Sequence, residues 1–153
     1  MKTIQFPQKT RLNIMRLEIE AKSENESFAR STVAAFASRM NLTVTDIDDI
    51  KTAVSEAVTN AVVHGFDNRP DTNNIIVVEA ELYADRLMIK ISDNGNGISD
   101  IDGAMQPFAT TKPEQERSGM GFTVMQSFMD TLNVQSVKGR GTTISMQKFF
   151  KKA

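Results

Sequence analysis

A glutamate and an asparagine stand four residues apart in an otherwise small and apolar segment, Glu56-Ala-Val-Thr-Asn60. If this segment is helical, both side chains lie on one face. The amide oxygen of Asn60 could then ligate Mg²⁺, and the carboxylate of Glu56 could accept a proton from an attacking hydroxyl. The pair also fits the solvent-facing edge of an amphipathic helix. His64, further along this edge, is explained more simply by the dipole at the helix C-terminus.

Six of the eight glycines form Gly-x-Gly pairs that follow this segment in the chain. The pairs are Gly95/Gly97, Gly119/Gly121 and Gly139/Gly141. Glycine permits a positive φ and lets a ligand approach the backbone closely, so repeated pairs predict several loops that converge on one phosphate-bearing molecule. Taken singly, the first and last pairs are also typical of hairpin turns.

Two further features of the sequence favour a nucleotide-binding site. Asp93 ends an isoleucine-rich segment, where its carboxylate could accept a hydrogen bond from an exocyclic amine such as that of adenine. Ser118-Gly-Met-Gly121 directly precedes a predicted helix, so its backbone N–H groups are expected to hold phosphate oxygens, with Lys112 and Arg117 neutralising their charge. The spacing matches neither a P-loop nor a dinucleotide fingerprint. Asp93 also lacks the alternating oxygen ligands of a calcium loop.

Composition narrows the class of protein. A chain of 153 residues is the length of one ordinary domain, and a net charge of -1 offers no electrostatic footprint for nucleic acid or an anionic membrane. The absence of cysteine excludes disulfides and thiolate chemistry and fits a reducing compartment, so we expect a cytoplasmic protein. Residues 1–14 lack the apolar core of a secretory signal, and no apolar run is long enough to span a bilayer.

Hydrophobic periodicity predicts an α/β two-layer sandwich in which one mixed, mostly antiparallel sheet has helices on one face. The expected strands cover residues 15–21, 75–83, 87–92, 134–137 and 142–149. A first helix begins with a Ser23-x-x-Glu26 capping box, and a second runs from near Thr45 to Gly65. A third follows Gly121, with an apolar face that extends to Leu132. Residues 98–118 are expected to form a mobile lid.

Arg30 lies at the margin of the apolar stripe of the first predicted helix. The stripe itself consists of Ala29, Val33, Phe36, Ala37 and Met40. Arg30 has no acidic residue four positions after it, so its guanidinium is expected to be available for a carboxylate on another protein.

Taken in order, these motifs resemble the GHKL ATPase and kinase superfamily, whose ATP site is built from such boxes, and the resemblance covers most of the chain. The motifs are the Glu-x-x-x-Asn helix, Asp93-x-Gly-x-Gly97, Thr110-Thr-Lys112, Ser118-Gly-Met-Gly121 and Gly141-Thr-Thr143. Within that superfamily, four segments look closely like the anti-sigma F factor family of endospore-forming bacteria. They are Ser23-Glu-Asn-Glu-Ser-Phe-Ala-Arg30, Ser55-Glu-Ala-Val-Thr-Asn-Ala61, Thr110-Thr-Lys-Pro-Glu114 and Glu116-Arg-Ser-Gly-Met-Gly-Phe122.

The resemblance implies a homodimeric protein serine kinase that uses ATP and Mg²⁺. With ATP bound, it would inhibit the sporulation sigma factor F, and it would phosphorylate an anti-anti-sigma factor on serine. No direct contact with nucleic acid or membrane is implied.

The same resemblance assigns roles to individual residues. Glu56 would be the catalytic base, Asn60 the magnesium ligand, Asp93 the adenine-binding residue, and Arg30 the residue shared by both protein partners. Arg117 would contact the γ-phosphate, and Gly119 and Gly121 would cradle the phosphates. The remaining ATP-binding positions would be Gly95, Gly97, Thr110, Thr111, Lys112, Ser118, Met120 and Thr142.

Two alternatives share this sequence pattern: a related anti-sigma kinase of general stress regulation, and a binding protein that uses ATP as a switch without transferring phosphate. The presence of both Glu56 and Asn60 argues against the second. A sensor histidine kinase is disfavoured because the only histidine, His64, lies on the ATP-site helix itself. Residues 1–14 depart from the family pattern, as an extension or as an upstream start before Met15, and residues 15–153 are expected to form the single domain.

Overall fold

The computed structural model describes residues 10–105 and 121–150. Their strands form one five-stranded sheet in the order β1-β2-β3-β5-β4, with every neighbouring pair antiparallel. The bounds are β1 (Asn13–Glu20), β2 (Ile75–Leu82), β3 (Arg86–Asp93), β4 (Thr131–Val137) and β5 (Gly141–Phe149). β1 therefore begins two residues before Met15, where the single domain was expected to start.

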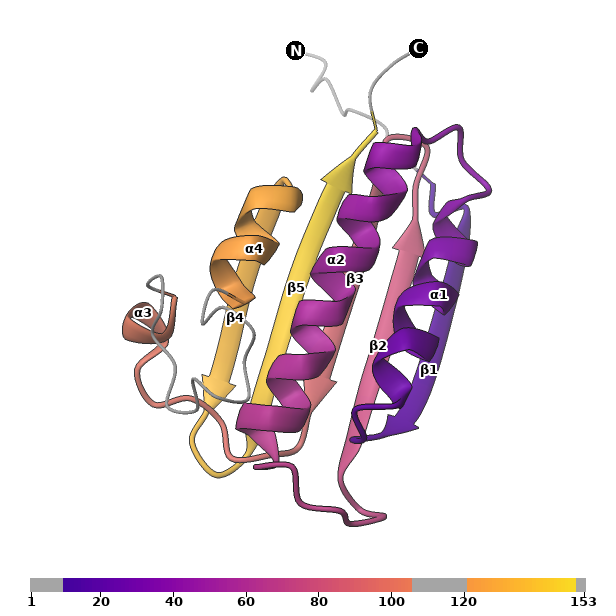
Figure 1. The fold of residues 1–153 in the computed structure, drawn as a ribbon. Helices are drawn as coiled ribbons and strands as arrows, with labels where there is room; N and C mark the ends of the chain where they lie inside the picture. Colours follow the sequence, from indigo (N-terminus) through magenta and orange to yellow (C-terminus); the bar gives the residue numbers. More distant parts are fainter. Residues whose placement is uncertain (1–9, 106–120, 151–153) are drawn as a thin grey trace, which may run out of the picture.

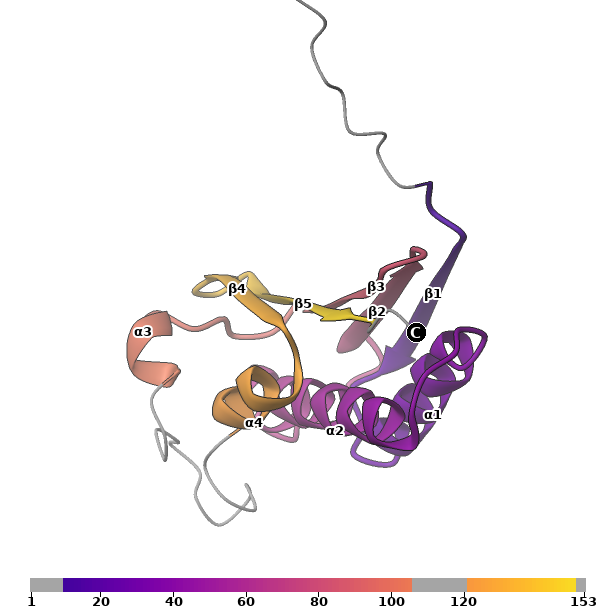
Figure 2. The ribbon, with the colours of Figure 1, turned by 90° about the horizontal axis from the view of Figure 1, so that it is seen from above.

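Helices α1 (Asn25–Ala37), α2 (Val44–Asn60) and α4 (Gly121–Phe128) lie over one face of the sheet (Figures 1 and 2). A π-helical turn, η1 (Ala61–Gly65), extends α2, and the short α3 (Ile101–Ala104) lies beyond β4. The predicted two-layer sandwich with helices on one face is confirmed. Within the described ranges, no helix combines the length and apolar character that a membrane span needs.

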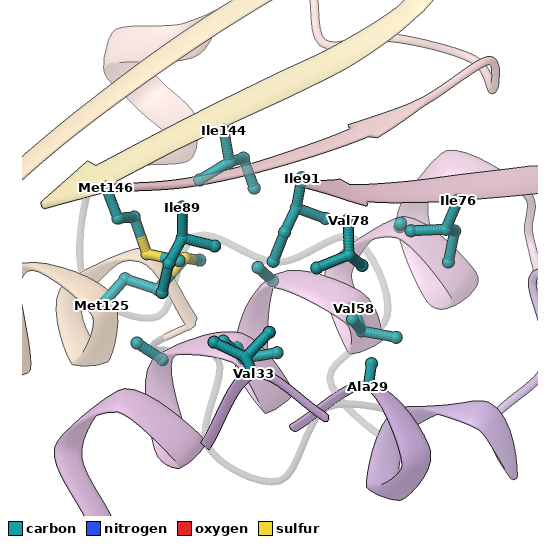
Figure 3. Packing of buried hydrophobic residues seen from close by; sticks show 14 of the residues in the cluster. Ala29, Val33, Val58, Ile76, Val78, Ile89, Ile91, Met125, Ile144 and Met146 are labelled. Atoms are coloured by element: carbon teal, nitrogen blue, oxygen red, sulfur yellow. The ribbon is translucent and has the colours of Figure 1, made fainter. Parts of the chain in front are cut away.

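The core lies between the sheet and the helices. On β2 and β3 buried residues alternate with more exposed ones, because only one face of the sheet is covered. Val78, Ile89 and Ile91 point from the sheet toward Val33 and Val58 on the helices (Figure 3). The sheet and its helices thus form one continuous apolar core.

The start of α2 differs from the prediction by two residues. Its N-cap is Thr43 rather than Thr45, and Thr43 Oγ1 accepts a hydrogen bond from the backbone N–H of Asp46 (3.0 Å). The Asp46 carboxylate accepts one in return from the backbone N–H of Thr43 (3.3 Å). Thr45 also has an acidic residue three positions later, Asp48, but the reciprocal box forms at Thr43.

The capping box predicted at Ser23 does not form. Helix α1 begins at Asn25, and its N-cap residue, Glu24, makes no side-chain capping bond. The Asn25 amide instead donates to the carbonyl oxygen of Glu20 at the end of β1 (2.9 Å). The link back to the strand therefore helps to fix where the helix begins.

The third helix is shorter than predicted, because α4 ends at Phe128 and Leu132 belongs to β4. Asp130 directs the chain into the sheet: its backbone N–H donates to the carbonyl oxygen of Gln147 (2.8 Å), and its carboxylate accepts from the N–H of Phe149 (2.6 Å). β4 consequently begins at Thr131 rather than at Val134.

Candidate functional site

Three segments that are distant in the sequence meet at one end of the sandwich: the end of η1, the loop after β3 and the turn between β4 and β5 (Figure 1). The backbone N–H of Asn96 donates to the carbonyl oxygen of Gly65 (2.8 Å), and the N–H of Gly139 donates to that of Asn96 (2.6 Å). Two of the predicted glycine pairs thus come together. Of the third pair, Gly121 is the first residue of α4, and Gly119 lies outside the described residues.

Glycine is required at Gly95 and Gly141, among other positions, because the backbones approach each other closely. A Cβ atom at Gly95 would collide with the carbonyl group of Gly65, and one at Gly141 would collide with the carbonyl oxygen of Asp93. Gly141 also has a φ of +120°, which side chains rarely adopt. Much of the glycine pattern is therefore explained by the packing of the chain around Asp93.

Asp93, the last residue of β3, lies at the centre of this packing. One carboxylate oxygen accepts a hydrogen bond from the backbone N–H of Gly95 (2.9 Å), and Gly65 lies directly against the same carboxyl group. Burial raises the pKa of Asp93, and the backbone N–H groups of Gly95 and Thr142 partly offset this rise. The carboxylate keeps lone pairs for a further donor, such as an exocyclic amine on a ligand.

A hydroxyl network lies beside Asp93, whose register partner on β5 is Thr142. Ser136 Oγ accepts from the backbone N–H of Ile98 (2.6 Å), donates to the carbonyl oxygen of Gly141 (3.1 Å) and lies 2.8 Å from Thr142 Oγ1. Because Ser136 has one proton, the buried Thr142 hydroxyl is the donor in the last contact. Thr142 was predicted as a site residue, whereas Ser136 was not. The only feature of the sequence that could have pointed to Ser136 is that its hydroxyl lies shortly before the last glycine pair.

Asn60 and Glu56 both lie near the C-terminal end of α2. Asn60 is only 9% exposed, and within residues 10–105 and 121–150 no hydrogen bond joins its amide to another residue. A nearly buried amide with unused capacity fits a ligand or metal contact better than a solvent-facing position. Glu56, one turn earlier, is half-buried. The two residues therefore lie one turn apart on α2, and the amide of Asn60 keeps capacity for a further contact.

We predicted a regular α-helix up to Gly65, but the structure differs. After Asn60 the helix widens into the π-helical turn η1, in which the carbonyl oxygen of Ala61 accepts from the N–H of Phe66 (3.0 Å). π-turns occur frequently at functional sites, and here the turn brings Gly65 against Asp93. His64 lies within this turn and is half-buried.

Arg30 lies on α1, where its guanidinium already has an acidic partner within the chain. Its Nη1 is 2.7 Å from Glu26 Oε1, with the two side chains 39% and 23% exposed. The sequence argument considered only the position four residues later, although the position four residues earlier is equally close on a helix.

Seven predicted site residues lie outside the described ranges: Thr110, Thr111, Lys112, Arg117, Ser118, Gly119 and Met120. Of the predicted site residues, the structure describes Asp93, Gly95, Gly97 and Thr142 around the end of β3, Glu56 and Asn60 on α2, and Gly121 at the start of α4.

The raised pKa of Asp93 gives a prediction about stability. The folded state binds this proton more tightly than the unfolded state, so the carboxyl group favours folding at low pH and opposes it as pH rises from the ordinary value of 3.8 through the raised pKa. In the unliganded protein, the free energy of unfolding of wild type relative to Asp93→Asn should therefore fall across that window. Chemical denaturation from pH 4 to 7 measures it, and a difference that stays constant or grows with pH would contradict the assignment.

Comparison with known proteins identifies the family. Residues 19–148 match the family described as "Histidine kinase-like ATPase domain". The anti-sigma F factor of Clostridium kluyveri is 52% identical over 138 residues, which cover 90% of this chain and 95% of that protein. The anti-sigma F factor of Thermoanaerobacter pseudethanolicus is also 52% identical, over 137 residues that cover 90% and 94%.

A solved structure supports the fold independently. The crystal structure of the RsbU and RsbW domains of Rv1364c from Mycobacterium tuberculosis aligns with a TM-score of 0.62, covering 90% of this chain and 32% of that one. At 18% identity, this likeness concerns the fold alone.

Proposed function

Because the chain belongs to the anti-sigma F factors, within the family of histidine kinase-like ATPases, we propose that it inhibits the sporulation sigma factor F in an ATP-dependent manner. We further propose that it phosphorylates an anti-anti-sigma factor on serine. This activity would place the protein in the cytoplasm, where sigma factors act.

The ATP site is supported most directly by the convergence of backbone segments on Asp93. Its carboxylate would accept a hydrogen bond from the exocyclic amine of adenine, while Gly95 and Gly97 let the loop after β3 pack closely against Gly65 and Val137 and so hold Asp93 in place. Mg²⁺, when bound, would neutralise phosphate charge, and Asn60 is the described residue suited to hold it. Gly121, at the start of α4, would help to cradle the phosphates.

In the proposed reaction the serine oxygen of the substrate attacks the γ-phosphorus. The bond to the β–γ bridging oxygen breaks, ADP leaves, and the serine proton passes to Glu56. Lys112 and Arg117 are proposed to carry phosphate charge from the segment before α4. Glu56 lies one helical turn from Asn60, so base and metal ligand would be held by the same rigid element.

The proposal predicts that the nucleotide controls capture of the sigma factor. A γ-phosphate can order a segment that contacts it, but a ligand shifts an equilibrium only by its differential affinity for the two states. We expect sigma factor F to bind about 5- to 150-fold more tightly with ATP than with ADP. Titration of the sigma factor into the chain with each nucleotide measures this ratio, and equal affinities would refute the switch.

The general-stress alternative has less support, because the relatives at 52% identity are anti-sigma F factors. Transfer of phosphate to a sporulation substrate, compared with transfer to a stress-response substrate, would distinguish the two.

We also propose a homodimer in which the two sheets join through β1. This strand lies at a sheet edge, so the outward-facing N–H and C=O groups of its backbone have no neighbouring strand within the described residues. Arg16 and Glu18 are exposed on it and lie 3.1 Å apart. In an antiparallel pairing of two copies centred on Leu17, Arg16 would lie opposite Glu18 of the partner subunit. The charge pattern of the strand is thus complementary to itself.

Charge reversal tests this pairing. Arg16→Glu would place like charges opposite each other twice, so we expect the dimer to dissociate about 30-fold more readily, at roughly 1 kcal/mol for each of the two opposed pairs. Adding Glu18→Arg should restore the dimer by exchanging the two charges. Analytical ultracentrifugation measures both effects, and an unchanged dimer in the single variant would place the interface elsewhere.

A further inference from the structure

Helix α4 connects two parts of the proposed site. It begins at Gly121, at the predicted phosphate turn, and it packs against α2, which carries Glu56 and Asn60 (Figures 1 and 2). The position of α4 along α2 therefore sets the distance between the proposed phosphate cradle and the proposed metal ligand. Whatever fixes this position would influence how ATP is held.

The apolar layer beneath α4 is rich in methionine. Met125, Met129 and Met146 are each 5% exposed or less, and Met125 lies beside Met146 in Figure 3. Methionine side chains are flexible and adapt to their surroundings, so such a layer holds a helix against the sheet without strongly specifying its axial position. A directional contact is needed for that.

Lys148 supplies this contact. It lies on the helix-facing side of β5, two residues after the buried Met146, at a position where the strand pattern calls for an apolar residue. Its Nζ is 3.1 Å from Asp49 Oδ2 on α2 and donates a hydrogen bond to the carbonyl oxygen of Phe128, the last residue of α4 (2.7 Å). The side chains of Lys148 and Asp49 are only 13% and 18% exposed. One ammonium group thus ties together β5, α2 and α4.

Such an ion pair is better suited to specifying geometry than to adding stability. Desolvation of two mostly buried charges offsets much of their attraction, and replacement of such a pair by apolar residues is often neutral or stabilising. Asp49 is eleven residues before Asn60 on α2, about 16 Å at 1.5 Å per residue, so the pair does not touch a ligand at the other end. Any influence on ATP must act through the position of α4.

We propose that Lys148 is a positioning residue for the ATP site: by binding Asp49 and the carbonyl end of α4, it fixes that helix along α2 and aligns its first residue with Asn60. This inference rests on the proposed function, since it assumes that the start of α4 receives phosphate.

The test separates positioning from stability. Lys148→Met leaves Asp49 mostly buried without its cation, so it should lower both the free energy of unfolding and the affinity for ATP. Lys148→Met combined with Asp49→Leu replaces the pair by apolar side chains, and it should recover stability while its affinity for ATP stays about tenfold below wild type. Lys148→Arg, which keeps the charge, should recover part of that affinity. Lys90→Met, on the uncovered face of β3, is the matched control and should change neither quantity.

Calorimetric titration with ATP and chemical denaturation of the same variants provide both readouts. If the affinity of the double variant for ATP recovers together with its stability, Lys148 is merely structural and the inference is overturned. If the unaltered chain fails to bind ATP, the proposed function itself is refuted. The two failures are therefore distinguishable.

Discussion

Replacement of Glu56 by glutamine should lower the rate of serine phosphorylation by about 10² to 10⁴ and leave ATP-dependent capture of the sigma factor intact. Glutamine keeps the size and hydrogen-bonding capacity of the side chain but cannot accept the serine proton. Phosphoryl transfer otherwise depends on positioning and charge stabilisation, which this change leaves in place. The measurement is single-turnover transfer to the anti-anti-sigma factor at saturating ATP.

Asn60→Ala provides the contrast to this variant. Asn60 is nearly buried, and the proposal gives its amide to Mg²⁺, so its loss should weaken nucleotide binding and every ATP-dependent function together. If Glu56→Gln phosphorylates its substrate at a near wild-type rate, Glu56 is not the base. If Asn60→Ala binds ATP normally, the assignment of the metal ligand is wrong.

Replacement of Arg30 by alanine should weaken the binding of both protein partners by roughly 2 to 5 kcal/mol, with ATP affinity unchanged. Arg30 lies on α1, and its guanidinium is already oriented by Glu26 at 2.7 Å. The intramolecular pair is partly exposed and is worth only about 0.3–0.5 kcal/mol, so the guanidinium can readily bind a carboxylate on a partner as well. Titration calorimetry with each partner measures the loss.

Arg39→Ala is the matched control, because Arg39 is exposed just beyond the end of α1. It removes the same charge from the same region, so a general electrostatic effect would appear in both variants. Unchanged binding of both partners by Arg30→Ala would exclude the proposed role. A parallel loss of ATP affinity would mean that the substitution had damaged the fold.

The fold was largely predictable because its signals are periodic. The alternation on β2 and β3 is a property of consecutive residues, and the structure confirms it. The stripe predicted on the first helix is confirmed for Ala29, Val33 and Ala37, whereas Phe36 is only partly buried and Met40 lies beyond the end of α1. The errors occurred where contacts between residues distant in the sequence determine where a helix or strand begins. Asn25 ties the start of α1 to Glu20, and Asp130 turns the chain from α4 into β4 through Gln147 and Phe149.

The site was predictable as a set of residue types but not in its supporting contacts. Asp93 and the glycine pairs could be selected because carboxylates and glycines have restricted uses. Ser136 could not, since its importance arises from the meeting of Ile98, Gly141 and Thr142 around one hydroxyl. The π-turn after Asn60 likewise leaves no periodic signal in its apolar sequence. The roles assigned to Glu56, Asn60 and Arg30 remain predictions.

The most direct test of the central claim, that this chain is an ATP-dependent anti-sigma factor with serine kinase activity, is transfer of labelled γ-phosphate. The chain would be incubated with γ-labelled ATP, Mg²⁺ and the purified anti-anti-sigma factor, and the modified residue identified by mass spectrometry. We predict label on one serine of that partner and its loss with Glu56→Gln. Binding of ATP and sigma factor without any transfer of label to the partner would contradict the kinase assignment and leave a nucleotide-switched binding protein.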